Sequence, residues 1–137
     1  MPSQDGAAFR RQTHERIGHD RVAAVVDDFY ERVQAHPALA VPFLMVNDWA
    51  LHKARLTHFW WVALGGRRYR PDRYDVAGKH LAVGVNDALV DDWLALFDAT
   101  LRDHLPPELA HAWLERARLM GVSVRQTTAF YARKAGR

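Results

Sequence analysis

The chain has 137 residues, of which 49 % are hydrophobic, with 5 Trp and 6 Phe, as expected of one globular domain and not of a disordered segment. It has 8 histidines and no cysteine, which excludes disulfides, thiolate catalysis, iron–sulfur clusters, c-type haem attachment and cysteine-based zinc sites. The 19 basic and 16 acidic residues give a net charge of +3 and are interspersed, so no basic stripe indicates a nucleic-acid partner.

The N-terminal segment 1–18 has no apolar run resembling a signal peptide, and no later stretch offers the roughly 18 apolar residues of a membrane span. We therefore expect a soluble, cytoplasmic protein without a membrane partner. We predict a single domain over 1–137, in which 1–18 forms an N-terminal extension or a short helix.

The first long helix is predicted to begin after Gly18, with Asp20 as its N-cap. Its apolar residues recur with helical spacing and form one continuous stripe: Val22, Val25, Val26, Phe29, Tyr30 and Val33. His36-Pro37 should end it, because the residue before proline is steered out of the α region. Residues 37–47 are expected to be irregular.

Asn47 or Asp48 can cap a second helix, which the Gly65-Gly66 pair should end. The inner face of this helix contains Trp49, His52, Leu56, Phe59, Trp60 and Ala63. Residues 67–78 carry proline, glycine and charge without a period, which is typical of a loop. Residues 79–83, "KHLAV", form at most a turn or two of helix.

Two more helices follow, from about Asn86 to His104 and from Pro107 to about Ala132, with proline at a favoured first helical position. Their apolar stripes contain Leu89, Val90, Trp93, Leu96, Phe97 and Leu101, and then Leu109, Trp113, Ala117, Met120, Val124 and Tyr131. No stretch alternates with period two for long enough to form a sheet. The predicted fold class is all-α, with five to seven helices.

Four residues able to do chemistry occupy these apolar segments: Tyr30, His52, His80 and Trp93. Each has an ordinary structural interpretation. Tyr30 can be a core tyrosine bonded to a carbonyl, because an unsatisfied buried hydroxyl costs roughly 1–3 kcal/mol. His52 can be a satisfied boundary histidine, Trp93 a large core residue, and His80 a structural histidine between two glycines.

Taken together, the same residues suit haem. A neutral imidazole such as His80 can ligate iron through one nitrogen while the other donates to a carbonyl. Haem also needs a broad apolar slot, which Phe43, Phe59, Trp60, Trp93 and Phe97 could line. Tyr30 and Trp93 carry hydrogen-bond donors for a diatomic ligand.

The pattern resembles the truncated haemoglobins, specifically their group III, over about residues 22–125. The motifs are Phe29-Tyr30, Pro42-Phe43, "WALHKARLTHFW" over 49–60, "KHL" over 79–81 and "WLALFDAT" over 93–100. The loop before "KHL" is longer than in the family pattern, and the Gly65-Gly66 pair is more typical of groups I and II.

The resemblance implies a truncated globin fold, a two-over-two helical sandwich around haem b (iron protoporphyrin IX). His80 matches the proximal iron ligand, and Tyr30, His52 and Trp93 match the distal ligand-binding residues. The cofactor-binding positions are Phe29, Phe43, Leu56, Phe59, Trp60 and Phe97.

The implied ligands are oxygen, nitric oxide and carbon monoxide. Tight hydrogen bonding makes a poor oxygen-transport protein, which favours sensing or redox chemistry, such as nitric oxide dioxygenation or a peroxidase-like reaction with an external reductase. His52 could then relay protons. Whether the protein is an enzyme stays open, and a monomer or weak dimer is expected.

Two other interpretations compete with a haem globin. A helical bundle with a carboxylate-bridged metal pair would need two Glu-x-x-His repeats, and the sequence has one, Glu108 to His111. A haem-free binding or sensor module of globin-like fold would explain the helices equally well, but it leaves the four chemically apt residues unexplained.

Overall fold

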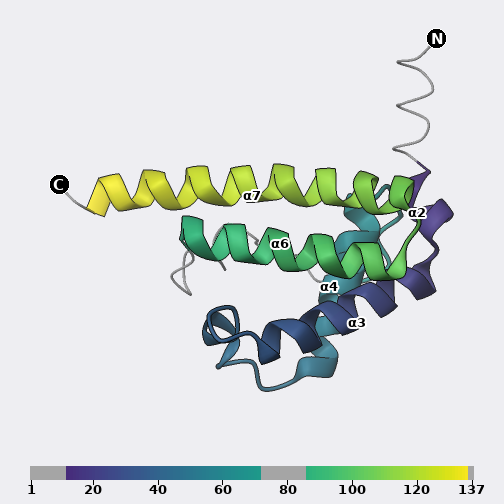
Figure 1. Cartoon of the computed structure of the whole chain (residues 1–137), viewed down its shortest axis with the longest axis horizontal. Coiled ribbons are helices and arrows are strands. Elements are labelled where there is room, and N and C mark those ends of the chain that lie inside the picture. The colour runs from purple at the N-terminus through teal and green to yellow at the C-terminus, as the bar shows by residue number, and fades with distance from the viewer. Residues whose placement is uncertain (1–11, 72–85, 136–137) are drawn as a thin grey trace, which may run out of the picture.

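A computed structural model describes residues 12–71 and 86–135 of the chain (Figure 1). Its helices are α2 (Thr13–Ile17), α3 (His19–Ala35), the 3₁₀-helix η1 (Val41–Phe43), α4 (Trp49–Ala63), α6 (Asp87–His104) and α7 (Pro107–Ala135). Every regular element in these two ranges is helical, which confirms the predicted all-α fold. The segment that carries His80 and "KHLAV", and the side chain of Tyr131, lie outside the described residues.

The long helices form two packed pairs. Figure 1 shows α6 and α7 running antiparallel beside each other, with α3 on the other side of α6. Helix α4 packs against α3, and the short α2 contacts both α3 and α7. This pairing of α3 with α4 and of α6 with α7 agrees with a two-over-two sandwich. None of the described helices is both long and apolar enough to cross a membrane.

The ends of α3 follow from two local features. Gly18 adopts a φ of 85°, a left-handed conformation that favours glycine, and α3 begins at the next residue without a side-chain cap. The prediction of Asp20 as N-cap is therefore wrong, because Asp20 already lies within the first turn, where its charge favours the helix dipole. At the other end His36 is extended before Pro37, as predicted.

The starts of the other long helices also follow from local chemistry. The Asp48 carboxylate accepts a hydrogen bond of 3.0 Å from the backbone N–H of Leu51, so Asp48 and not Asn47 caps α4. The Asn86 side chain accepts the N–H of Leu89 at 3.0 Å and caps α6. Helix α7 begins at Pro107, as the sequence predicts.

Helix α4 ends at the Gly65-Gly66 pair. Gly65 has a φ of 111°, and a Cβ atom added to Gly66 would lie 2.3 Å from Nε1 of Trp61. The Trp61 ring therefore packs directly on the backbone of the turn, and a side chain at Gly66 would displace it.

An aromatic cluster forms the centre of the core. Phe97 of α6 is fully buried and contacts Phe29 of α3 at 4.9 Å, Trp60 of α4 at 5.5 Å and Trp113 of α7 at 5.5 Å between ring centroids. The Trp60 ring stacks on it with an interplanar angle of 21°, whereas Trp113 meets it edge-on at 78°. Both arrangements are favoured for aromatic pairs. One ring thus joins all four long helices that the structure describes.

A polar network ties α3 to the end of α6 at the surface. Asp28 lies 2.7 Å from His104 Nε2 and accepts a hydrogen bond of 2.9 Å from Arg32, which also donates to Asp103 at 2.7 Å. The hydrogen bond to His104 is the main cause that lowers the pKa of Asp28, and Arg32 adds to it against the opposing effect of burial.

This network should make stability depend on pH. Because the pKa of Asp28 is lowered on folding from its ordinary 3.8, its stabilisation is present above that value and is lost as the pH falls through the folded-state pKa. Asp28→Asn should therefore lower the free energy of unfolding by up to about 1 kcal/mol at neutral pH and by less under acid conditions. Urea unfolding across the pH range measures this difference.

The control is Asp98→Asn, which removes a pair with Arg102 inside α6 alone and should have a smaller effect at neutral pH. An Asp28→Asn effect that stays constant down to acid pH would contradict the role assigned to the carboxylate.

Candidate functional site

A cavity of about 420 Å³ lies between the two helix pairs, a volume within the range of small-molecule sites. Helix α4 provides one wall, with Leu51, His52, Arg55, Leu56, Phe59 and Trp60. The opposite wall comes from α6 and α7, with Leu89, Val90, Trp93, Ala117, Met120, Gly121 and Val124. Tyr30 of α3 and the segment from Leu39 to Asp48, which includes Phe43 and Met45, close the remaining side.

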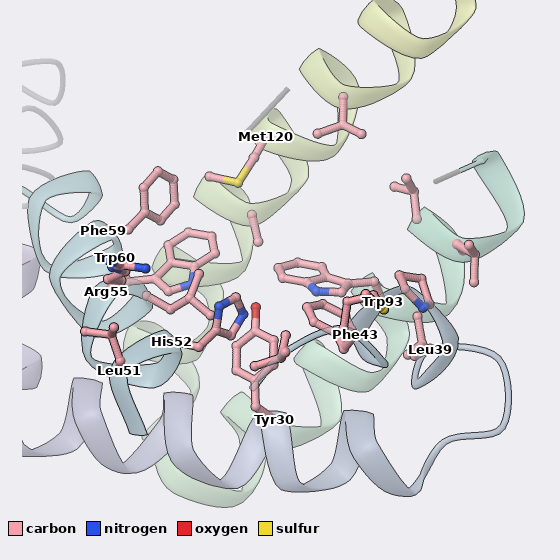
Figure 2. Close-up of a pocket in the computed structure, with 18 of the residues that line it drawn as sticks. Tyr30, Leu39, Phe43, Leu51, His52, Arg55, Phe59, Trp60, Trp93 and Met120 are labelled. Atoms are coloured by element: carbon pink, nitrogen blue, oxygen red, sulfur yellow. The ribbon is translucent and has the colours of Figure 1, made fainter. Parts of the chain in front are cut away.

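Three side chains that can donate hydrogen bonds converge on this cavity from three helices. Figure 2 shows Tyr30 of α3, His52 of α4 and Trp93 of α6 directed into the same space. The rings of Tyr30 and His52 meet edge-on, with centroids 5.8 Å apart. The structure therefore brings together the three residues that the sequence predicts as ligand-binding, although they are far apart in the chain.

Tyr30 is held rigidly by its neighbours. The residue is 4 % exposed, and its ring contacts those of Phe43 at 5.7 Å and Trp49 at 6.1 Å in addition to His52. It lies at the cavity end of the apolar stripe of α3, which explains why helical spacing alone identifies it as buried. Tyr30 is thus a core residue and a cavity residue at the same time.

Trp93 is fixed by the aromatic core behind it. Its indole stacks on Phe97 with centroids 4.9 Å apart and meets Phe29 edge-on at 5.1 Å. Phe29 and Phe97, predicted as cofactor-binding, are 1 % and 0 % exposed and are not among the residues that line the cavity. Within the described structure these two residues support Trp93 and Trp60.

The other predicted pocket positions do line the cavity: Phe43, Leu56, Phe59 and Trp60. His80, the predicted iron ligand, lies outside the described residues. Its position relative to the cavity therefore stays a prediction.

The sequence interpretation missed the wall that α7 contributes. Ala117, Met120 and Val124 belong to the apolar stripe that the sequence predicts on this helix, and they line the cavity. A Cβ atom added to Gly121, between them, would lie 3.3 Å from Cγ1 of Val90, so the backbone of α7 approaches α6 closely beside the cavity. The stripe was the available signal, but it does not distinguish a wall from a core face.

The charged residue next to His52 faces α3 and not the cavity. Lys53 donates hydrogen bonds to Asp27 at 2.8 Å and to Glu31 at 2.6 Å. Burial acts to lower the pKa of Lys53, but the hydrogen bonds to the two carboxylates outweigh it and raise the pKa, so the ammonium stays charged. Arg55, two residues after Lys53 on α4, lines the cavity instead.

The cavity suits a flat apolar cofactor. Its walls present aromatic rings and branched aliphatic side chains from opposite helix pairs, and Tyr30 and His52 lie side by side at one place on its edge. A macrocycle such as haem needs broad apolar contact, and a small polar ligand beside it needs donors in a dry space. The described residues provide the apolar walls and the hydrogen-bond donors.

Comparison with known proteins adds one finding. A protein-family model described as bacterial-like globin matches residues 12–125. No curated protein and no solved structure matches the chain significantly.

Filling the cavity should block binding without unfolding the chain. Met120→Trp places a larger ring in the wall of α7 and should weaken the binding of an apolar fluorescent dye roughly tenfold, equivalent to about 1.4 kcal/mol. Val122→Trp is the matched control, because Val122 is 51 % exposed on the same helix and does not line the cavity. Dye titration measures both, and equal affinity in the two variants would contradict this assignment of the binding space.

Proposed function

Because the chain belongs to the bacterial-like globin family, a family of haem proteins that bind diatomic gases, we propose that it holds haem b in the cavity between α4 and the α6–α7 pair. The proposed ligands are oxygen, nitric oxide and carbon monoxide. The observation that carries the proposal is the convergence of Tyr30, His52 and Trp93 on one apolar cavity of about 420 Å³.

In this proposal some residues of the chain contact the haem macrocycle and one binds its iron. Phe43, Leu56, Phe59 and Trp60, which line the cavity, would provide the apolar surface for the macrocycle. His80, in the "KHL" motif, is the proposed iron ligand. When bound, haem supplies an open coordination position and a redox-active iron. Phe29 and Phe97, which do not line the cavity, would hold Trp93 in place through their ring contacts.

Tyr30 and Trp93 would stabilise a ligand that carries partial negative charge. The burial of Tyr30 and the ring contacts of both residues fix the donors before the ligand arrives, so little ordering cost remains. Hydrogen bonds to charged groups contribute roughly 1.5–3 kcal/mol. At about 1.4 kcal/mol per decade, this corresponds to roughly tenfold to a hundredfold slower release of oxygen.

His52 has a different proposed role. It is half-buried at the wall of the cavity, and an imidazole can accept and give up a proton near neutral pH. We assign it the transfer of protons between the cavity and solvent. With slow ligand release, this favours nitric oxide dioxygenation or a peroxidase-like reaction supported by an external reductase, over bulk oxygen transport.

The finer assignments belong to the same proposal. They are membership of group III of the truncated haemoglobins, a single domain over 1–137, a cytoplasmic location, and a monomer or weak dimer. Each rests on the sequence pattern set out above.

The absorption spectrum tests the cofactor. Purified protein should show an intense Soret band with one iron per chain, and ferrous protein should change its spectrum reversibly with carbon monoxide and oxygen. His80→Ala should lose stable haem, whereas His111→Ala, at an exposed position on α7, should keep it. A colourless protein that refuses added haemin would instead support the haem-free module of globin-like fold.

Oxygen dissociation rates test the donors. Tyr30→Phe and Trp93→Phe should each release oxygen roughly tenfold to a hundredfold faster, while carbon monoxide release changes little, because carbon monoxide carries less charge. Tyr69→Phe is the control, since Tyr69 is 52 % exposed and should leave both rates unaltered. Unchanged oxygen rates in both cavity variants would remove these residues from the proposed role.

A further inference from the structure

Lys53 connects α4 to α3 directly beside the cavity. It follows His52 in the chain, and its Nζ lies 2.8 Å from Asp27 Oδ1 and 2.6 Å from Glu31 Oε1. The Lys53 side chain is only 16 % exposed, whereas those of Asp27 and Glu31 are 67 % and 63 % exposed. The stem of Lys53 is therefore largely covered at the helix interface, and its ammonium is held near the surface by two exposed carboxylates.

The two carboxylates lie on α3 on either side of Tyr30 in the sequence. Asp27 and Glu31 are one helical turn apart on α3, and Tyr30 lies on that same turn. Two bonds from one ammonium to points a turn apart restrict both sliding and rotation of α4 along α3. A single bond would leave one of these motions free.

The neighbours of Lys53 on α4 also face this junction. Trp49, one turn earlier, contacts the Tyr30 ring at 6.1 Å, and Leu56, nearly one turn later, lines the cavity. Lys53 is thus flanked on α4 by one residue that contacts Tyr30 and one that lines the cavity, while its charged end bonds to two exposed carboxylates. A shift of α4 at this point moves His52 relative to Tyr30.

We propose that Lys53 is a positioning residue for the cavity: its double bridge sets the separation of Tyr30 and His52 and thereby the hydrogen-bonding field that a bound ligand experiences. Lys53 itself does not line the cavity. The functional half of this inference rests on the proposed function, whereas the positioning half concerns the chain alone.

Other ion pairs of the described chain show why this bridge is different. Arg102 with Asp98 and Arg118 with Glu115 each lie within one helix, so they cannot set a distance between helices. Arg125 pairs with Asp91 and joins α7 to α6, so it does not act on the separation of α3 and α4. Arg32 forms a comparable bridge from α3, but it reaches Asp103 near the end of α6, ten residues from Trp93 along that helix. Arg32 therefore provides a matched control.

The first measurement follows the ring contact in the full-length chain. Lys53→Gln should weaken or abolish the nuclear Overhauser effect between the Tyr30 and His52 rings, whose centroids are 5.8 Å apart. Lys53→Arg, which keeps the charge, should retain it. Arg32→Gln should lower the unfolding temperature but keep the ring contact.

The second measurement uses the full-length chain loaded with haem. Lys53→Gln should broaden or shift the C–O stretching band of the carbon monoxide complex and speed oxygen dissociation roughly three- to tenfold, as expected for a residue that acts through another. Lys53→Arg and Arg32→Gln should each keep the C–O stretching band and the oxygen dissociation rate of the unaltered protein.

The outcomes separate the two proposals. An intact ring contact in Lys53→Gln, or equal loss in Arg32→Gln, overturns the positioning role, because the effect would then be absent or would reflect general loosening of α3. A lost ring contact with unchanged C–O stretch and oxygen rate overturns the functional half. Failure of the proposed function is recognised independently by unchanged oxygen rates in Tyr30→Phe and Trp93→Phe.

Discussion

The contacts of one phenylalanine ring hold the described structure together. Phe97 touches Phe29, Trp60 and Trp113, so it meets one aromatic residue from each of the other three long helices. Large rings bury much apolar area and have few rotamers, which makes this cluster both stabilising and rigid. Since the helix positions are set around Phe97, the walls of the cavity are set there as well.

Helices α4 and α6 contribute residues both to the core and to the wall of the neighbouring cavity. On α6, Phe97 belongs to the core and Trp93, one turn earlier, faces the cavity. The two rings stack, so the indole is braced from behind and cannot swing freely into the open space. On α4, Trp60 belongs to both the core and the cavity wall, since it stacks on Phe97 and also lines the cavity.

Family membership and local structure explain different parts of the protein. The match over residues 12–125 accounts for the helical fold and for haem binding in general. What a ligand would experience depends on this chain's own side chains, on the burial of Tyr30 and on the contact that brings it to His52. The Lys53 bridge that joins α3 to α4 lies outside the cavity lining.

The helices and most of their ends could be predicted from sequence, because caps and stops act within a few residues. Asp48, Asn86, Pro107 and the His36-Pro37 pair all behave as local chemistry requires. The start of α3 after Gly18 could be predicted as well, but its cap could not, because the positive φ of Gly18 is visible only in three dimensions.

The sequence by itself determined the buried stripe of α3 and which inward-facing residues carry useful donors. Only the tertiary structure decided what each buried face meets. Periodicity places Phe97 and Met120 on inward stripes alike, yet Phe97 lies in the core and Met120 lines the cavity. The physical reason is that the core and the cavity wall both select apolar side chains, and the difference arises only from the helix packed opposite.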